Sequence, residues 1–180
     1  MSTWISLLRG INVGGQKRLR METLRAIYAE LGFNNIRTYV QSGNVIFESQ
    51  EQDQVKLHQR IEVRIEQACG YPIKVFILQP AELDRILNGN PFVHRNEDLS
   101  KLHVTFLYLT PTDVAWGKIT SPGNISDEFA PGEMAVYLFC PNGYGKTRLS
   151  NNFFERKLGM PVTTRNWNTV NALSNMAAER

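Results

Sequence analysis

The chain has 180 residues, a hydrophobic content of 42% and a formal net charge of +3. That length is enough to bury a core as one domain of ordinary size or as two small domains. Residues 1–79 hold ten basic and seven acidic side chains, residues 80–135 four and eight, and residues 136–180 six and two. A dedicated nucleic-acid-binding protein concentrates positive charge more strongly, so this balance permits an anionic ligand without requiring one.

The sequence predicts neither a disulfide, nor a metal site, nor a membrane segment. Cys69 and Cys140 lie far apart without a CxxC spacing, which favours two buried, reduced thiols. His58, His94 and His103 do not have the spacing of zinc ligands, so we expect no metal. The amino terminus has no positively charged segment before a long apolar stretch, and we expect a cytoplasmic protein without a membrane partner. The sequence leaves the oligomeric state open.

The first half of the chain predicts the order β-α-β-β-α-β. Short apolar runs predict its strands, and apolar residues at intervals of three and four predict its helices. The predicted elements are the strand Trp4–Leu8, a loop Arg9–Arg20, a helix Met21–Leu31 closed by Gly32, strands Ile36–Gln41 and Asn44–Glu48 joined by the two-residue turn Ser42–Gly43, the helix Gln52–Cys69 and the strand Ile73–Leu78.

The second half predicts a similar order in which a helix replaces the last strand. Its predicted elements are the helix Ala81–Leu87, the strand His103–Leu109, a weak helix Pro111–Ile119, a short strand Phe129–Ala130, the strand Met134–Cys140, and helices Arg148–Leu158 and Asn166–Ala178. We therefore expect an α+β fold of two ferredoxin-like (βαββαβ-type) modules, residues 1–79 and 80–180. Their sheets are expected to be mostly antiparallel with helices packed on one face, and an extra helix is expected at the carboxyl terminus.

One candidate binding site lies in two loops of the first half. Right-handed crossovers place the loop after the first strand beside the turn between the second and third strands. Glycines expose backbone N–H groups and basic side chains attract anions, so the loops favour phosphate or carboxylate. The alternative is an ordinary turn whose glycines satisfy positive φ and whose basic side chains are solvated. The candidate residues are Arg9, Asn12, Gly14, Gly15 and Lys17 with Ser42 and Asn44.

A second candidate lies in residues 141–147, which end in Gly-Lys-Thr between a predicted strand and helix. A phosphate-binding P-loop would need glycine where Cys140 stands, and the expected sheet is antiparallel, so we expect no nucleotide hydrolysis here. Contact between Lys146 and an anion, or an ordinary turn, both remain open.

A third candidate opens the last predicted helix, where residues 163–169 carry several hydroxyl and amide groups beside Arg165 and Trp167. These groups can cap the helix, yet one cap needs only one or two of them. Trp167 either anchors the helix to the core or offers its ring to a ligand beside Arg165, Asn166 and Asn168.

Four segments together resemble the bacterial domain of unknown function 1697 family. They read LLRGINVGG (7–15), YVQSGNVIF (39–47), PNGYGKTRLSNNFFERKLG (141–159) and TTRNWNTVNAL (163–173), and the resemblance covers nearly the whole chain. It implies an α+β fold with two ferredoxin-like subdomains and implies no established activity, substrate or cofactor.

Three functional hypotheses follow. The first is binding of a small anionic or nucleotide-like ligand through the glycine-rich basic loop. The second is single-stranded nucleic-acid binding, which the βαββαβ order permits although the aromatic signature of RRM strands is missing. The third is an enzyme with a polar arginine, lysine and asparagine site between the two subdomains. The titratable side chains do not assemble into a complete catalytic constellation. No cofactor motif is found either, since the first loop does not match the dinucleotide-binding pattern GxGxxG.

Overall fold

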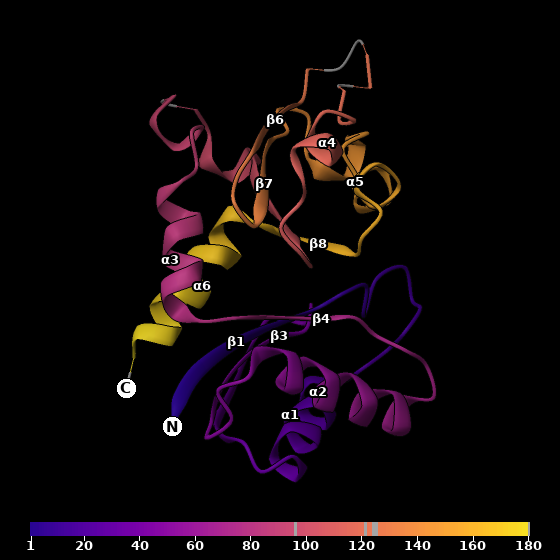
Figure 1. Ribbon diagram of the computed structural model, residues 1–180, viewed down its shortest axis with the longest axis vertical. Coiled ribbons are helices and arrows are strands. Elements are labelled where there is room, and N and C mark those ends of the chain that lie inside the picture. Colours follow the sequence, from indigo (N-terminus) through magenta and orange to yellow (C-terminus); the bar gives the residue numbers. More distant parts are fainter. Residues whose placement is uncertain (96, 121, 124–125, 180) are drawn as a thin grey trace. The chain divides into compact units, whose positions relative to one another are not determined.

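The computed structural model describes residues 1–95, 97–120, 122–123 and 126–179, and the chain divides into two compact units (Figure 1). The first unit comprises Met1–Leu83 with Ala172–Arg180, and the second comprises Asp84–Asn171. Both boundaries between the units fall within a helix, one in α3 (Pro80–Asn88) and the other in α6 (Trp167–Ala178).

The first unit has the predicted order of strands and helices. Its elements are β1 (Ser2–Leu8), α1 (Met21–Glu30), β2 (Asn34–Tyr39), β3 (Asn44–Ser49), α2 (Gln54–Cys69) and β4 (Val75–Leu78). The strands form an antiparallel sheet in the order β2-β3-β1-β4. Because β3 lies antiparallel between β1 and β2, the β1–α1 loop and the β2–β3 turn lie at the same end of the sheet, as predicted.

Helix α2 shows how local chemistry sets the bounds of an element. It begins after Asp53, whose Oδ1 accepts hydrogen bonds from two backbone N–H groups of the first turn over 2.9 and 3.2 Å. Leu57, Ile61 and Ile65 repeat every four residues and are fully buried. The helix ends at Gly70, whose φ of 77° is the left-handed conformation that favours glycine at this position.

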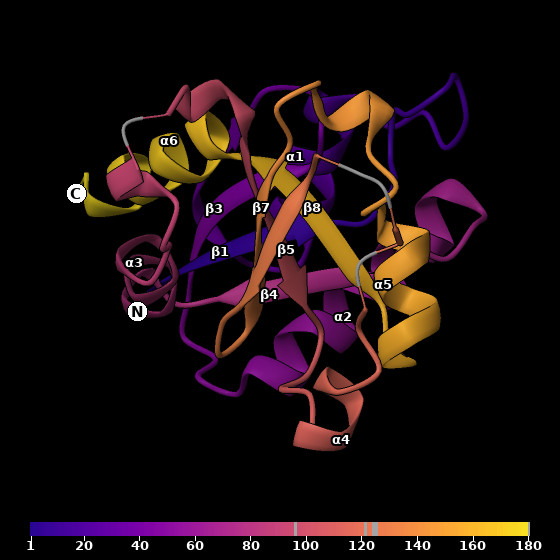
Figure 2. The same ribbon diagram turned by 90° about the horizontal axis from the view of Figure 1, so that it is seen from above.

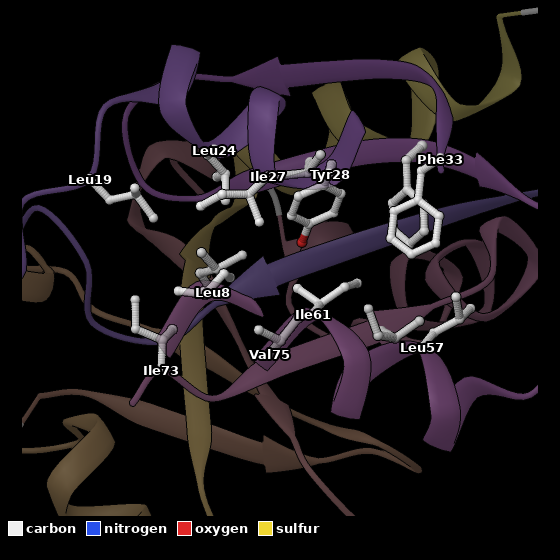
Figure 3. Close-up of a cluster of buried hydrophobic side chains, with 14 of the residues drawn as sticks. Leu8, Leu19, Leu24, Ile27, Tyr28, Phe33, Leu57, Ile61, Ile73 and Val75 are labelled. Carbon is white, nitrogen blue, oxygen red and sulfur yellow. The ribbon is translucent and has the colours of Figure 1, made fainter. Parts of the chain in front are cut away.

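The core of the first unit lies between its sheet and helices α1 and α2, which cover the same face (Figures 1 and 3). Leu24, Ile27 and Tyr28 of α1 meet strand residues there, and the Tyr28 ring stands edge-on to Phe47 at 5.2 Å. The Tyr28 hydroxyl lies in an apolar core and needs a hydrogen-bond partner, which it finds in Oγ of Ser6 on β1, 2.7 Å away. Burial raises the pKa of this phenol.

The β2–β3 connection differs from the prediction. Four residues, 40–43, separate the strands, whereas the sequence predicted the two-residue turn Ser42–Gly43. Val40 leaves the extended conformation with a φ of 50°, which ends β2 at Tyr39. The Asn44 side chain then donates to the Tyr39 oxygen over 3.0 Å and closes the loop. The apolar Val40 gave no turn signal in the sequence.

The second unit repeats the architecture of the first. Its elements are the 3-10 helices η1 (Val93–Arg95) and η2 (Leu99–Lys101), then β5 (Leu102–Leu107), α4 (Asp113–Trp116), β6 (Glu128–Pro131), β7 (Ala135–Phe139), the 3-10 helix η3 (Tyr144–Lys146), α5 (Asn151–Leu158) and β8 (Val162–Asn166). Figure 2 shows β5, β7 and β8 side by side with α5 next to β8. Phe153, Phe154 and Leu158 of α5 pack with sheet residues in this unit's core.

Strand β8 corrects the prediction that the final strand is missing. The sheet order β6-β7-β5-β8 reproduces that of the first unit, with β8 in the place of β4. Residues Thr163 and Thr164, interpreted from the sequence as capping groups, pair with Phe106 and Thr105 of β5. β-branched threonines suit a strand, but their hydroxyls gave the segment the appearance of a helix start. The predicted α+β fold of two ferredoxin-like modules is confirmed.

A helix can span a bilayer only if it is long and apolar enough. Among the residues that the structure describes, no helix combines the length and the apolar character that spanning a bilayer requires.

Candidate functional site

The β1–α1 loop, residues Arg9–Arg20, folds into a small hairpin, and we call this segment the basic loop. Val13 and Gln16 form a β-bridge, and the N–H group of Gln16 donates to the Val13 oxygen over 3.2 Å. Between them Gly14 and Gly15 have φ values of 60° and 76°. A two-residue hairpin loop of this kind needs positive φ at both central positions, so the turn itself accounts for both glycines.

Asn12 holds the basic loop in place. Its Nδ2 donates to the backbone oxygens of Leu19, over 2.9 Å, and of Gln41, over 2.7 Å, while its Oδ1 accepts from the Leu19 N–H group over 2.9 Å. The structure thereby brings together the first two motifs, which lie far apart in sequence. Asn12 acts on the protein backbone, and these bonds position the loop.

The β2–β3 turn packs tightly against the basic loop. A side chain at Gly43 would place its Cβ 2.7 Å from Leu8 Cβ and from Ile11 Cδ1. The Leu8 N–H group donates to the Gly43 oxygen over 2.9 Å. Asn44 is fully buried, and its Nδ2 donates to the Ser42 hydroxyl over 2.9 Å, so Ser42 and Asn44 order the turn.

Positive charge remains the distinctive feature of this end of the first unit. The basic loop carries four cations and no carboxylate. Lys17, Arg18 and Arg20 are exposed, and Arg9 is half-buried. Lys17 has a left-handed φ of 46°, and its Nζ lies 3.4 Å from the Pro72 oxygen.

In the second unit, the Gly-Lys-Thr segment forms η3 and a turn rather than a P-loop. It follows β7, which pairs antiparallel with both β5 and β6. Thr147 donates to Oδ2 of Asp127 over 2.6 Å and accepts from the Leu149 N–H group over 3.0 Å, so its hydroxyl orders the turn. Lys146 is exposed.

The third motif divides between β8 and the start of α6. Arg165 is 8% exposed on β8, and its NH1 donates to the Thr163 hydroxyl over 2.8 Å. Asn166 ends the strand and caps α6, because its Oδ1 accepts from the Thr169 N–H group over 2.8 Å. Trp167 is buried, which fits the anchoring alternative, whereas Asn168 is exposed.

Sequence reasoning placed His103 at the start of a strand and considered its side chain only as a metal ligand, so it missed the neighbours of that side chain in the second unit. It pairs in register with Asn166 across β5 and β8, and its ring stacks on that of Tyr144 with centroids 4.8 Å apart. Burial lowers the pKa of His103. The alternation of His103 and Thr105 on the predicted strand was a usable signal, because it places two polar side chains on one face.

His103 therefore joins the second and third motifs at one end of the second sheet. Tyr144 comes from the Gly-Lys-Thr segment and Asn166 from the segment before α6. No three His, Cys, Asp or Glu side chains among the described residues are grouped to hold a metal ion.

Comparisons with known proteins identify the family. A family model described as "Protein of unknown function (DUF1697)" matches residues 1–137. The chain belongs to this family. No curated protein matches it.

The fold recurs in a solved structure described as that of the conserved bacterial protein SP0830 from Streptococcus pneumoniae. The two chains superpose with a TM-score of 0.74 over 98% of each and share 23% sequence identity. This likeness supports the α+β fold of the DUF1697 chain and does not extend to a ligand.

Proposed function

We propose that the first unit binds a small anionic, nucleotide-like ligand at the basic loop. The observation that carries the proposal is charge: Arg9, Lys17, Arg18 and Arg20 lie within twelve consecutive residues that contain no carboxylate. Like charges so close together repel one another, and a bound anion relieves that repulsion.

The fixed shape of the loop supports the proposal. Asn12 and Gly43 hold the loop against the neighbouring turn, so the cations lie on an ordered segment. A preorganised loop loses less conformational entropy on binding than a mobile one. In this arrangement Arg9 and Lys17 supply charge, Gly14 and Gly15 supply backbone N–H groups, and Asn12, Ser42 and Asn44 hold the geometry.

A small ligand fits the geometry better than a nucleic-acid strand. RRM domains stack bases on aromatic side chains of their first and third strands. Here the aromatic residues of β1 and β3, Trp4 and Phe47, are 1% and 0% exposed and lie in the core against the helices. Nucleic-acid binding and an enzymatic activity stay alternatives.

The experiment is thermal unfolding against a panel of nucleotides and phosphorylated metabolites. We expect at least one phosphorylated member to raise the melting temperature of the wild-type chain, because a ligand that binds only the folded state stabilises it. The variant carrying Arg9→Ala and Lys17→Ala should lose this shift. The absence of any shift with the wild type, or an unchanged shift with the double variant, would refute the proposal.

A matched control removes the same charge elsewhere. Lys56→Ala with Arg85→Ala deletes two exposed cations outside the basic loop and should leave the ligand-induced shift intact. Salt-dependent retention on immobilised oligonucleotides separates the nucleic-acid alternative, because phosphate contacts along a strand weaken steeply between roughly 50 and 200 mM salt.

A further inference from the structure

His103 is held in one orientation on the helix-facing side of β5. Leu107, four residues further along the strand, packs in the core with α5, and alternation places His103 on the same face. His103 is 9% exposed, and the Tyr144 ring lies nearly parallel to its imidazole, with an interplanar angle of 25°. Two stacked rings restrict the rotation of each other.

The protonation of this ring follows from its one backbone contact. Nδ1 of His103 lies 3.3 Å from the Lys101 oxygen, and a carbonyl oxygen can only accept a hydrogen bond. The proton of the neutral ring therefore belongs on Nδ1, which leaves a lone pair on Nε2. Burial lowers the pKa of His103 and so favours this neutral form at physiological pH. Within the described part of the chain, no residue is bonded to Nε2.

Asn166, which pairs with His103 across the two strands, carries a donor on the same face of the sheet. Residues paired in register across antiparallel strands have Cβ atoms about 5 Å apart on the same face. The Oδ1 atom of Asn166 is committed to the cap of α6, so the amide is oriented with its Nδ2 group as the remaining donor. Lys146 follows Tyr144 by two residues and is exposed, which adds positive charge near this end of the sheet.

Next to His103 and Asn166 on the same face of β5 and β8, a row of hydrogen-bonded polar side chains joins the two strands. The Thr105 and Thr164 hydroxyls lie 2.8 Å apart, and Thr164 donates to Oδ1 of Asn151 over 2.6 Å. These groups satisfy one another, whereas Nε2 of His103 and Nδ2 of Asn166 are bonded to no described residue. An acceptor and a donor are thus left on two residues that pair across β5 and β8.

We propose that His103, Tyr144 and Asn166 form a ligand-binding site in the second unit, for a small molecule that carries a hydroxyl group next to an anionic group. The ligand hydroxyl donates to Nε2 of His103, and its anionic oxygen accepts from Nδ2 of Asn166, with Lys146 adding charge. The site is independent of the anion site proposed for the first unit, because it uses none of that site's residues.

The test follows the imidazole proton and nitrogen resonances by NMR during titration with paired probes. Glycolate is compared with acetate, and glycerol 3-phosphate with inorganic phosphate, since each pair differs in the hydroxyl-bearing part. We expect a saturable shift of the His103 resonances with at least one hydroxylated probe and a clearly weaker response to its partner. His58 and His94 serve as internal references that do not shift. No saturable shift of His103, or equal shifts within both pairs, would overturn the proposal.

Two variants assign the roles of the nitrogen atoms. His103→Phe keeps a ring for Tyr144 and removes Nε2, so binding, followed on the Tyr144 resonances, should be lost while the chain stays folded. Asn166→Asp keeps an oxygen for the cap of α6 and removes the Nδ2 donor, which should weaken binding about tenfold. Asn175→Asp adds the same charge at an exposed position further along α6 and should bind as the wild type does. Equal weakening by the two aspartate variants, or unchanged binding by His103→Phe, would refute the assigned contacts.

Discussion

Nδ2 of Asn12 donates a hydrogen bond to the backbone oxygen of Gln41 over 2.7 Å, across a sequence separation of 29 residues. This bond joins the basic loop to the β2–β3 turn. Asn12 has a φ of 55°, a conformation that asparagine adopts more readily than most residues. The side chain thus links the two loops, while the Asn12 N–H group donates to the Lys17 oxygen within the basic loop.

Asn12→Ala should therefore destabilise the first unit. The substitution removes three hydrogen bonds to backbone groups, and we expect a loss of about 2 kcal/mol in the free energy of unfolding. Urea denaturation measures it. Asn35→Ala is a matched control, because Asn35 is exposed and has a φ of 48°, so alanine meets the same backbone strain there. Equal losses at the two positions would show that the hydrogen bonds of Asn12 contribute nothing.

Gly43→Ala should be more disruptive than any other glycine-to-alanine change in the two loops. The new Cβ would lie 2.7 Å from Leu8 Cβ and Ile11 Cδ1, and the φ of 74° adds strain. We expect a cost of about 2–4 kcal/mol, from overpacking and backbone strain together. Gly10→Ala isolates the strain, because its φ is 68° and nothing lies within 4 Å of its Cβ. Thermal melts of both variants compare the costs; a similar melting temperature for the two would contradict the packing argument.

Cys140 should resist alkylation in the folded chain. It is fully buried in the second unit, and burial raises the pKa of its thiol to about 11. At pH 8 only about one thiol in a thousand is then the reactive thiolate. In a Cys69→Ser variant, mass spectrometry should find iodoacetamide on Cys140 only after unfolding in urea. Modification at the same rate with and without urea would show that the thiol is accessible.

The stability of the chain should fall as the pH is lowered through 6.5. Burial lowers the pKa of His103 below the 6.5 of an unperturbed histidine. The unfolded chain therefore binds this proton first, so the free energy of unfolding decreases with falling pH until the folded-state pKa is reached. Urea titrations between pH 7.5 and 5.5 measure the slope, and His103→Phe should make it shallower. An unchanged slope would mean that His103 titrates normally in the folded state.

The order of the elements was largely predictable because it depends on local periodicity. The buried stripe Leu57, Ile61 and Ile65 and the Asp53 cap of α2 are readable in the sequence, as are the apolar runs of β1 and β7. The prediction was wrong where the side chains of a segment suit either a helix cap or a strand and a neighbouring strand decides between the two. Thr163 and Thr164 can cap a helix or line a strand, and pairing with β5 made them a strand.

The sequence by itself determined the two ferredoxin-like modules, the family and the charge of the basic loop, since composition and periodicity are properties of the chain alone. Only the tertiary structure decided which polar groups are bonded within the fold. Asn12 and Asn44 were candidate ligand residues, yet their amides are bonded to loop backbone. His103 carried no motif, yet pairing of β5 with β8 sets it opposite Asn166. Hydrogen-bond partners that come from distant strands and loops cannot be read from spacing, because folding alone makes them neighbours.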